Sequence, residues 1–221
     1  MSLKLNGKEI ERVQIVDDDP MVRAAYKYPV EELQLEPILA EGPLPVLDQF
    51  ISETLTGADA AIFDHQLRVR NYAVFNGAES VARLYKHQFP AVLCTTWADA
   101  KIDEMRRYRR YIPVILRPDE LDPDSLKHGF EHCIKEFNGV FRPSRRPWRA
   151  LVSVEDVGQD EWSQFFFVTI PGWDPKEKIR LRLQDVSKIR ALIQPGALFH
   201  AQVNLGAESQ EELYFDAWEV D

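Results

Sequence analysis

Short apolar runs alternate with amphipathic segments over the first 138 residues. The apolar runs have the length and composition of buried strands, and the segments between them have the 3.6-residue period of helices. This alternation predicts an α/β fold, a doubly wound five-stranded parallel sheet with helices on both faces. Pro29 should kink or end the first helix early. The strands are predicted at 12–17, 35–40, 59–63, 90–95 and 112–116, and the helices at 20–33, 44–55, 77–88, 99–110 and 123–137.

The pattern of apolar and polar residues after residue 138 predicts a mainly β structure. A stretch rich in Pro, Gly and Arg at 139–147 predicts a linker between a domain at 1–138 and a smaller one at 148–221. The second domain shows three strands, a short amphipathic helix and two strands, which is the order of an OB-like barrel. The strands are predicted at 148–157, 162–170, 177–183, 197–205 and 212–220, and the helix at 185–194.

Composition places the chain among cytoplasmic globular proteins. Its 221 residues are 45% hydrophobic and 29% charged, which suits one large or two small domains. No apolar run approaches the length of a membrane span, and the N-terminus has no signal-like segment. Cys94 and Cys133 lie in apolar segments and are expected to be reduced core thiols.

Three consecutive carboxylates, Asp17, Asp18 and Asp19, follow the first predicted strand. Crowded anions repel one another unless a cation sits among them or one takes up a proton, so a divalent metal site is one interpretation. The other is a polar loop in which Asp19 caps a helix that begins at Pro20.

Further polar residues end the other predicted strands. Asp64 follows the third strand, Thr95 the fourth and Arg117 the fifth. In an open parallel sheet the carboxyl ends of the strands line the ligand crevice, so these side chains and the acidic pair are expected to converge. Oxygen ligands of this kind suit Mg²⁺.

The segments around these strand ends resemble the receiver domain of bacterial two-component response regulators. They read Val-Asp-Asp-Asp-Pro at 16–20, Ala-Ala-Ile-Phe-Asp at 60–64, Cys-Thr-Thr-Trp-Ala-Asp at 94–99 and Leu-Arg-Pro at 116–118. The resemblance covers about 10–138 and implies a flavodoxin-like fold. It also implies a histidine kinase or phosphotransfer protein as the phosphoryl donor.

The resemblance assigns a role to each residue. It makes Asp64 the phosphoacceptor, Thr95 the switch hydroxyl, and Arg117 the substitute for the usual lysine. It implies that Mg²⁺ is held by Asp17, Asp18, Asp64 and the backbone carbonyl of Gln66.

Two departures from the family pattern predict altered switching. The guanidinium group of Arg117 is planar and forked, so arginine is not a conservative replacement for lysine at a phosphate site. The segment 65–77 lacks the usual proline and is longer and more basic. Asp64 is still expected to accept a phosphoryl group.

The predicted helix at 99–110 carries the strongest charge cluster of the chain, with arginines at 106, 107, 109 and 110. One interpretation is a solvated helix face paired with nearby acidic residues. The other, drawn from the resemblance, is a surface for an output partner or for a homodimer. The isolated histidines are expected at the surface, and His65, next to Asp64, could tune the phosphoryl lifetime.

Charge argues against nucleic acid as a ligand. The chain has a net charge of -9, and from residue 145 onward nine basic residues face thirteen acidic ones, whereas phosphate contacts supply most non-specific affinity. Most aromatic side chains of the second domain are therefore expected in its core.

These observations favour a response-regulator-like signalling protein, which catalyses only its own phosphoryl transfer and dephosphorylation. In this interpretation, phosphorylation of Asp64 with Mg²⁺ switches the activity of a C-terminal protein-interaction domain. The alternatives are a phosphate-independent scaffold and a nucleic-acid-binding regulator that uses the barrel.

Overall fold

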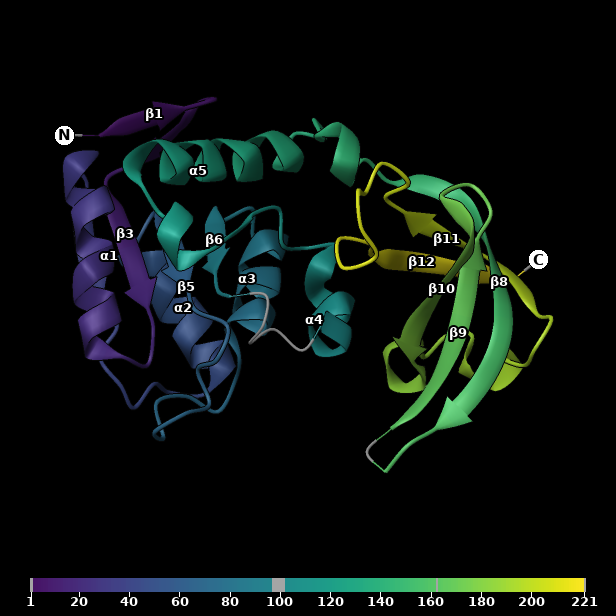
Figure 1. The fold of residues 1–221 in the computed structure, drawn as a ribbon. Coiled ribbons are helices and arrows are strands. Elements are labelled where there is room, and N and C mark those ends of the chain that lie inside the picture. The colour runs from purple at the N-terminus through teal and green to yellow at the C-terminus, as the bar shows by residue number, and fades with distance from the viewer. Residues whose placement is uncertain (1, 97–101, 162, 221) are drawn as a thin grey trace. The chain divides into compact units, whose positions relative to one another are not determined.

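The chain folds into two compact units in the computed structural model, which describes residues 2–96, 102–161 and 163–220 (Figure 1). The first unit consists of Met1–Lys101 and Tyr111–Phe141, and the second of Ile102–Arg110 and Arg142–Asp221. The short stretch Ile102–Arg110 thus belongs to the second unit, although parts of the first unit flank it in the sequence.

A five-stranded parallel sheet forms the centre of the first unit. Its strands follow the order β4-β3-β5-β6-β7, in which β3 comes first in the sequence. This is the 2-1-3-4-5 order of flavodoxin-like, doubly wound folds. The predicted fold class of this part is confirmed. The strands are β3 (Arg12–Val16), β4 (Glu36–Leu39), β5 (Ala60–Phe63), β6 (Ala91–Cys94) and β7 (Ile115–Leu116).

Two pairs of helices cover this sheet (Figure 1). Helix α1 packs against α5, and α2 packs against α3. Strands β5 and β6 are completely buried, as parallel strands covered on both faces require. No helix in the described ranges is long and apolar enough to cross a membrane. The helices are α1 (Pro20–Glu32), α2 (Leu47–Gly57), α3 (Gly77–Lys86) and α5 (Pro123–Phe137).

Helix α1 begins where the sequence predicts and ends later than Pro29 suggests. The Asp19 side chain caps it by accepting a hydrogen bond from the Met21 backbone N–H at 2.8 Å. The helix then continues through Pro29 to Glu32, so the expectation that Pro29 ends it early is wrong. Pro29 and the adjacent Val30 are both buried, and their packing outweighs the lost backbone hydrogen bond.

Two features of the first unit differ from the prediction. The N-terminus forms a hairpin of β1 (Leu3–Leu5) and β2 (Lys8–Ile10), joined by Asn6 and Gly7 with positive φ. An Asn-Gly pair is the usual residue choice for such a tight turn. The strand predicted at 112–116 is shorter, because β7 comprises only Ile115 and Leu116.

The second unit is built on an antiparallel five-stranded sheet. Its order is β10-β9-β8-β11-β12, so β10 and β12 are its edge strands. In the described residues no ladder joins these two edges, and closure into an OB-like barrel remains a prediction. The strands are β8 (Trp148–Gln159), β9 (Gln164–Ile170), β10 (Asp174–Arg182), β11 (Leu198–Val203) and β12 (Phe215–Val220).

The prediction of an amphipathic helix at 185–194 is wrong. The segment contains two 3₁₀ turns, Leu183–Asp185 and Arg190–Leu192. Val186 and Ile189, three residues apart, are both buried. Both lie between the two 3₁₀ turns, in a turn closed by the hydrogen bond from the Ile189 backbone N–H to the Val186 carbonyl at 3.3 Å, so their burial does not require a helix.

Helix α4 (Ile102–Arg109) is part of the second unit and contacts β10. Met105 is buried, and the buried Arg106 donates hydrogen bonds to the carbonyls of Gln210 at 2.6 Å and Leu213 at 3.2 Å. Arg109 is buried as well. The interpretation of the arginine cluster as a solvated helix face is therefore wrong for Arg106 and Arg109.

The buried side chain of Asn204 fastens three segments of the second unit. Its amide donates to the carbonyls of Ser144 at 2.9 Å and Glu212 at 3.1 Å, and its oxygen accepts from the Tyr214 backbone N–H at 2.9 Å. Buried backbone groups that lose such partners cost about 1–3 kcal/mol each.

Asn204→Ala is expected to lower the free energy of unfolding of the second unit by about 2–3 kcal/mol, because it leaves these backbone groups without partners. Urea unfolding followed by tryptophan fluorescence measures this, since four of the five tryptophans belong to this unit. Gln194→Ala removes an exposed amide from the same unit and is the control. Equal stability of the two variants would contradict the prediction.

Candidate functional site

A cavity of about 590 Å³ opens at the carboxyl ends of β3, β5 and β6. The parallel register sets Val16 beside Phe63, so the residues that follow these strands are neighbours. The structure brings together five residues that the sequence singled out, while α1 supplies part of the opposite wall. These five are Asp17, Asp18, Asp64, Gln66 and Thr95.

Asp17 is the most deeply placed of the carboxylates. The residue is only 5% exposed, and its side chain accepts a hydrogen bond from the Asp19 backbone N–H at 2.8 Å. Burial raises the pKa of Asp17 to about 6; the hydrogen bond opposes this rise, and the charges of Asp64, Asp18 and Asp19 add to it. The cluster thus has the repulsion that the sequence predicted, and a proton on Asp17 is one way to relieve it.

The Asp64 carboxylate is held by the loop that follows it. Its Oδ2 atom accepts a hydrogen bond from the Gln66 backbone N–H at 2.7 Å. The start of α3 lies close behind, where a Cβ atom added at Gly77 would come within 1.8 Å of the Asp64 carbonyl oxygen. Glycine is required at this approach, which fixes the path of the chain around Asp64.

Arg23 and Tyr72 support the backbone at Asp17. The largely buried Arg23 guanidinium donates to the Asp17 carbonyl and stacks 5.3 Å from the centre of the Tyr72 ring. The Tyr72 hydroxyl in turn donates to the Ala40 carbonyl at 2.6 Å. Neither residue is predicted from the sequence; a basic residue on the inner face of the predicted first helix is the available signal.

Arg70 brings a cation to the acidic residues. Its Nη1 atom lies 3.3 Å from Asp19 Oδ2, and its Nε atom lies 3.8 Å from Asp18 Oδ2. Arg70 and Asn71 both have positive φ, at 54° and 57°. Left-handed backbone costs non-glycine residues about 1–2 kcal/mol each, so contacts elsewhere in the loop must hold this conformation.

Arg117 is placed differently from what its predicted role requires. Its guanidinium lies 3.4 Å from Asp119 Oδ1 and 3.1 Å from Glu120 Oε1. In the described structure Arg117 is not among the residues that line the cavity. The cation that approaches the acidic residues comes from the loop after β5 instead.

Thr95, His65 and the two cysteines are all buried. Thr95 lines the cavity, and its backbone N–H donates to the Leu116 carbonyl at 2.9 Å, which fixes the end of β6. The expectation of a surface position is wrong for His65, whose carbonyl accepts hydrogen bonds from Leu67 and Gly77. These contacts tie the loop after Asp64 to the start of α3.

The donor set of the cavity is made of oxygen atoms. Within the described ranges, no three His, Cys, Asp or Glu side chains are close enough together to enclose a metal ion on their own. Mg²⁺ needs less than that, because it is commonly held by one or two carboxylates and keeps several water molecules. The carboxylates and the mutual repulsion at Asp17 fit such an ion.

No protein-family model and no curated protein sequence matches the chain. Among solved structures, it is similar to a response regulator receiver domain protein from Clostridium thermocellum, with 13% identity and a TM-score of 0.44 over 60% of this chain and 100% of that one. A CheY-like receiver domain protein from Methanospirillum hungatei JF-1 shares 18% identity, with a TM-score of 0.42 over 57% and 98% of the two chains. The response regulator TrrA from Thermotoga maritima, in complex with Mg²⁺ and BeF, shares 19% identity, with a TM-score of 0.38 over 49% and 86%.

Ionisation of Asp17 is expected to destabilise the metal-free protein. Its pKa of about 6 in the fold lies above the ordinary 3.8, so its contribution to stability is fully present below about pH 4 and is lost as the pH rises through 6. Asp17→Asn should therefore be more stable than the wild type at pH 7 by about 1–3 kcal/mol and similar to it at pH 4.

Urea unfolding in the presence of a chelator, followed by the helical circular dichroism signal, tests this difference. Asp48→Asn, at an exposed carboxylate of the same unit, is the control. A stability gap between Asp17→Asn and the wild type that does not change with pH would rule out the raised pKa.

Proposed function

We propose that the chain is a response-regulator-like signalling protein in which Asp64 accepts a phosphoryl group with the help of Mg²⁺. The observation that carries this proposal is the meeting of Asp17, Asp18, Asp64 and Thr95 at one edge of the sheet. The hydrogen bond from Gln66 that orients the Asp64 carboxylate supports it further. The proposed location is the cytoplasm.

Asp64 would act as the nucleophile. One of its carboxylate oxygens attacks the phosphorus of a phosphohistidine on a histidine kinase or phosphotransfer protein. The new O–P bond forms while the P–N bond breaks, and the imidazole nitrogen keeps the electron pair. Such a covalent acyl phosphate is an established role for aspartate, and its formation depends mainly on positioning and charge neutralisation.

Asp18, Asp64 and the Gln66 carbonyl would hold Mg²⁺, and Asp17 would take part directly or through one of the water molecules that the ion keeps. When bound, the ion would supply positive charge beside the incoming phosphoryl group. Asp17 must lose its proton to act as a ligand, because carboxylates bind metals in the ionised form. Metal binding should therefore release a proton from Asp17 at pH values near 6.

Thr95 and Arg117 would respond to the phosphoryl group. Thr95 lines the cavity at the end of β6, and its hydroxyl would donate a hydrogen bond to a phosphoryl group on Asp64. Arg117 would first have to exchange its ion pairs with Asp119 and Glu120. We therefore propose that Thr95 responds first and that Arg117 contributes only after it rearranges.

The C-terminal unit would be the output module, contacting another protein. Helix α4 belongs to this unit and follows Thr96 after residues 97–101, which lie outside the described ranges. Because Met105, Arg106 and Arg109 are buried, only the outer face of α4 remains for a partner or a homodimer. A role for this unit in binding nucleic acid has less support, since acidic residues outnumber basic ones there.

A phosphorylation-independent scaffold is the second candidate. The observation in its favour is that Arg70 lies near Asp18 and Asp19 while Arg117 contacts Asp119 and Glu120. An acidic site neutralised by the chain itself would not require a metal.

Incubation with acetyl phosphate and Mg²⁺ is expected to add the mass of one phosphoryl group to the intact protein. Asp64→Asn should abolish the gain, whereas Asp48→Asn, at an exposed carboxylate of the same unit, should retain it. Intact-protein mass spectrometry measures all three proteins. An unmodified wild type, or an unchanged gain in Asp64→Asn, would leave the scaffold as the better account.

Arg70→Gln is expected to tighten Mg²⁺ binding by roughly two- to fivefold, because exposed ion pairs of this kind contribute about 0.5–1 kcal/mol and the ion must replace Arg70 beside Asp18. Isothermal titration calorimetry measures the affinity. Arg68→Gln removes a positive charge from the same loop and controls for the general electrostatic effect of losing that charge. Equal affinities of the two variants would show that the Arg70 contact does not compete with the ion.

A further inference from the structure

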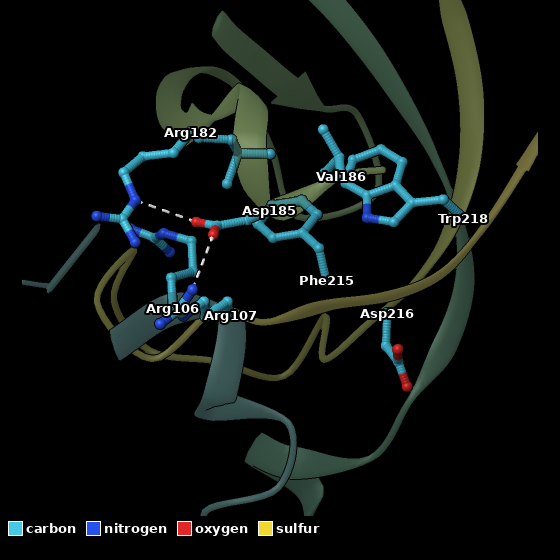
Figure 2. A pocket seen from close by; sticks show the side chains of 9 residues that line it. Arg106, Arg107, Arg182, Asp185, Val186, Phe215, Asp216 and Trp218 are labelled. Carbon is cyan, nitrogen blue, oxygen red and sulfur yellow. Dashed lines mark hydrogen bonds and ion pairs between the residues drawn. The ribbon is translucent and has the colours of Figure 1, made fainter. Parts of the chain in front are cut away.

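A second cavity, of about 130 Å³, lies within the C-terminal unit (Figure 2). Helix α4, the end of β10 and the edge strand β12 form its walls. One side is apolar and the other carries arginines. Pockets that bury drug-sized ligands have volumes of about 300–1,000 Å³, so this one suits a group of the size of a single ring or side chain.

Two aromatic rings form the apolar wall. Phe215 and Trp218 stack with their centres 5.7 Å apart and their planes 11° apart. Residues three apart in a regular strand point to opposite faces. Here Ala217 has a φ of 48°, and the β11–β12 register shifts between His200 and Gln202. This bulge turns both rings to the same side.

A bulge of this kind re-aims side chains at some cost in backbone strain. The buried Leu181 and Val186 complete the apolar wall beneath the two rings. The two rings and these two side chains thus give the cavity an apolar wall.

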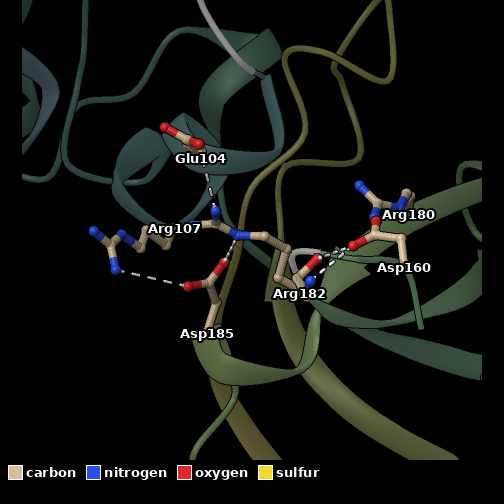
Figure 3. Close-up of polar contacts among 7 residues, drawn as sticks. Glu104, Arg107, Asp160, Arg180, Arg182 and Asp185 are labelled. Carbon is tan, nitrogen blue, oxygen red and sulfur yellow. Dashed lines mark hydrogen bonds and ion pairs between the residues drawn. The ribbon is translucent and has the colours of Figure 1, made fainter. Parts of the chain in front are cut away.

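The opposite side of the cavity carries more positive than negative charge. Arg106, Arg107 and Arg182 line it together with the Asp185 carboxylate, whereas the Asp216 carboxylate points away from the rings and the arginines (Figure 2). Glu104 lies on the far side of Arg182, 3.9 Å from its Nη1 atom (Figure 3). An anion would therefore be favoured over a cation.

Arg107 retains hydrogen-bonding capacity toward the cavity. Its Nη1 atom lies 3.8 Å from Asp185 Oδ1, which is an ion pair but longer than a hydrogen bond (Figure 3). Within the part of the chain that the structure describes, its other contact is the face of Tyr108, at 4.4 Å. By contrast, Arg182 is bound to Asp185 at 3.1 Å. A guanidinium with open donors binds a carboxylate through two parallel hydrogen bonds.

We propose that this cavity binds a small organic carboxylate with an aromatic or branched apolar body. The carboxylate accepts hydrogen bonds from Arg107, which gives up its weaker pairing with Asp185. The apolar body lies against Phe215 and Trp218. This site is separate from the phosphoryl chemistry proposed above and does not depend on it.

Phenylacetate is the probe for this site, titrated into the full-length protein while the indole N–H resonances are followed by NMR. The Trp218 resonance is identified by its loss in Trp218→Phe. A saturable shift of that resonance is expected. Phenethylamine has the same ring with the opposite charge and should bind at least about tenfold more weakly.

Arg107→Gln should weaken phenylacetate binding by about tenfold, because it removes a charge-assisted hydrogen-bond donor. Arg190→Gln removes an exposed arginine elsewhere in the same unit and should leave the affinity unchanged. Circular dichroism verifies that both variants are folded. The proposal is overturned by the absence of a saturable Trp218 shift, by equal binding of phenethylamine, or by equal affinities of the two arginine variants.

Discussion

Repulsion among carboxylates at one edge of a parallel sheet is the constraint around which the first unit is arranged. Asp17, Asp18 and Asp64 line one cavity because strands β3 and β5 end side by side. The chain offsets this repulsion locally through backbone N–H donors to Asp17 and Asp64 and through the approach of Arg70 to Asp18. Burial is the main cause of the raised pKa of Asp17, and the repulsion that remains adds to it.

The loop after β5 connects the repulsion among the carboxylates to the geometry of the backbone. It contains the donor to Asp64 at Gln66, the cation at Arg70 and the ring of Tyr72 that supports Arg23. The left-handed conformation of Arg70 persists because Tyr72 is anchored on both sides, by its hydroxyl to Ala40 and by its carbonyl to Leu44. The same dozen residues therefore set the charge, the shape and the access of the acidic cavity.

Local patterns were sufficient to predict the sheet and the meeting of the carboxylates. Buried parallel strands read as continuous apolar runs, and a polar residue at each strand end then has a known location. Arg70 could not be found in this way, because its contact with Asp19 spans 51 residues and depends on a strained loop. The sequence likewise places Arg117 beside the cavity, but its nearest acidic neighbours, Asp119 and Glu120, take up its guanidinium.

Helix α4 makes the second unit discontinuous in sequence, and this limits how the protein can be assembled or rearranged. The chain passes between the units three times, after Lys101, after Arg110 and after Phe141. During synthesis α4 emerges before Gln210 and Leu213, whose carbonyls accept hydrogen bonds from the buried Arg106, so these contacts form only after Leu213 has been added. Exchange of the C-terminal part as a cassette cut near residue 142 would separate the helix from its partners. Any recombination that preserves both units must carry α4 with the C-terminal sheet.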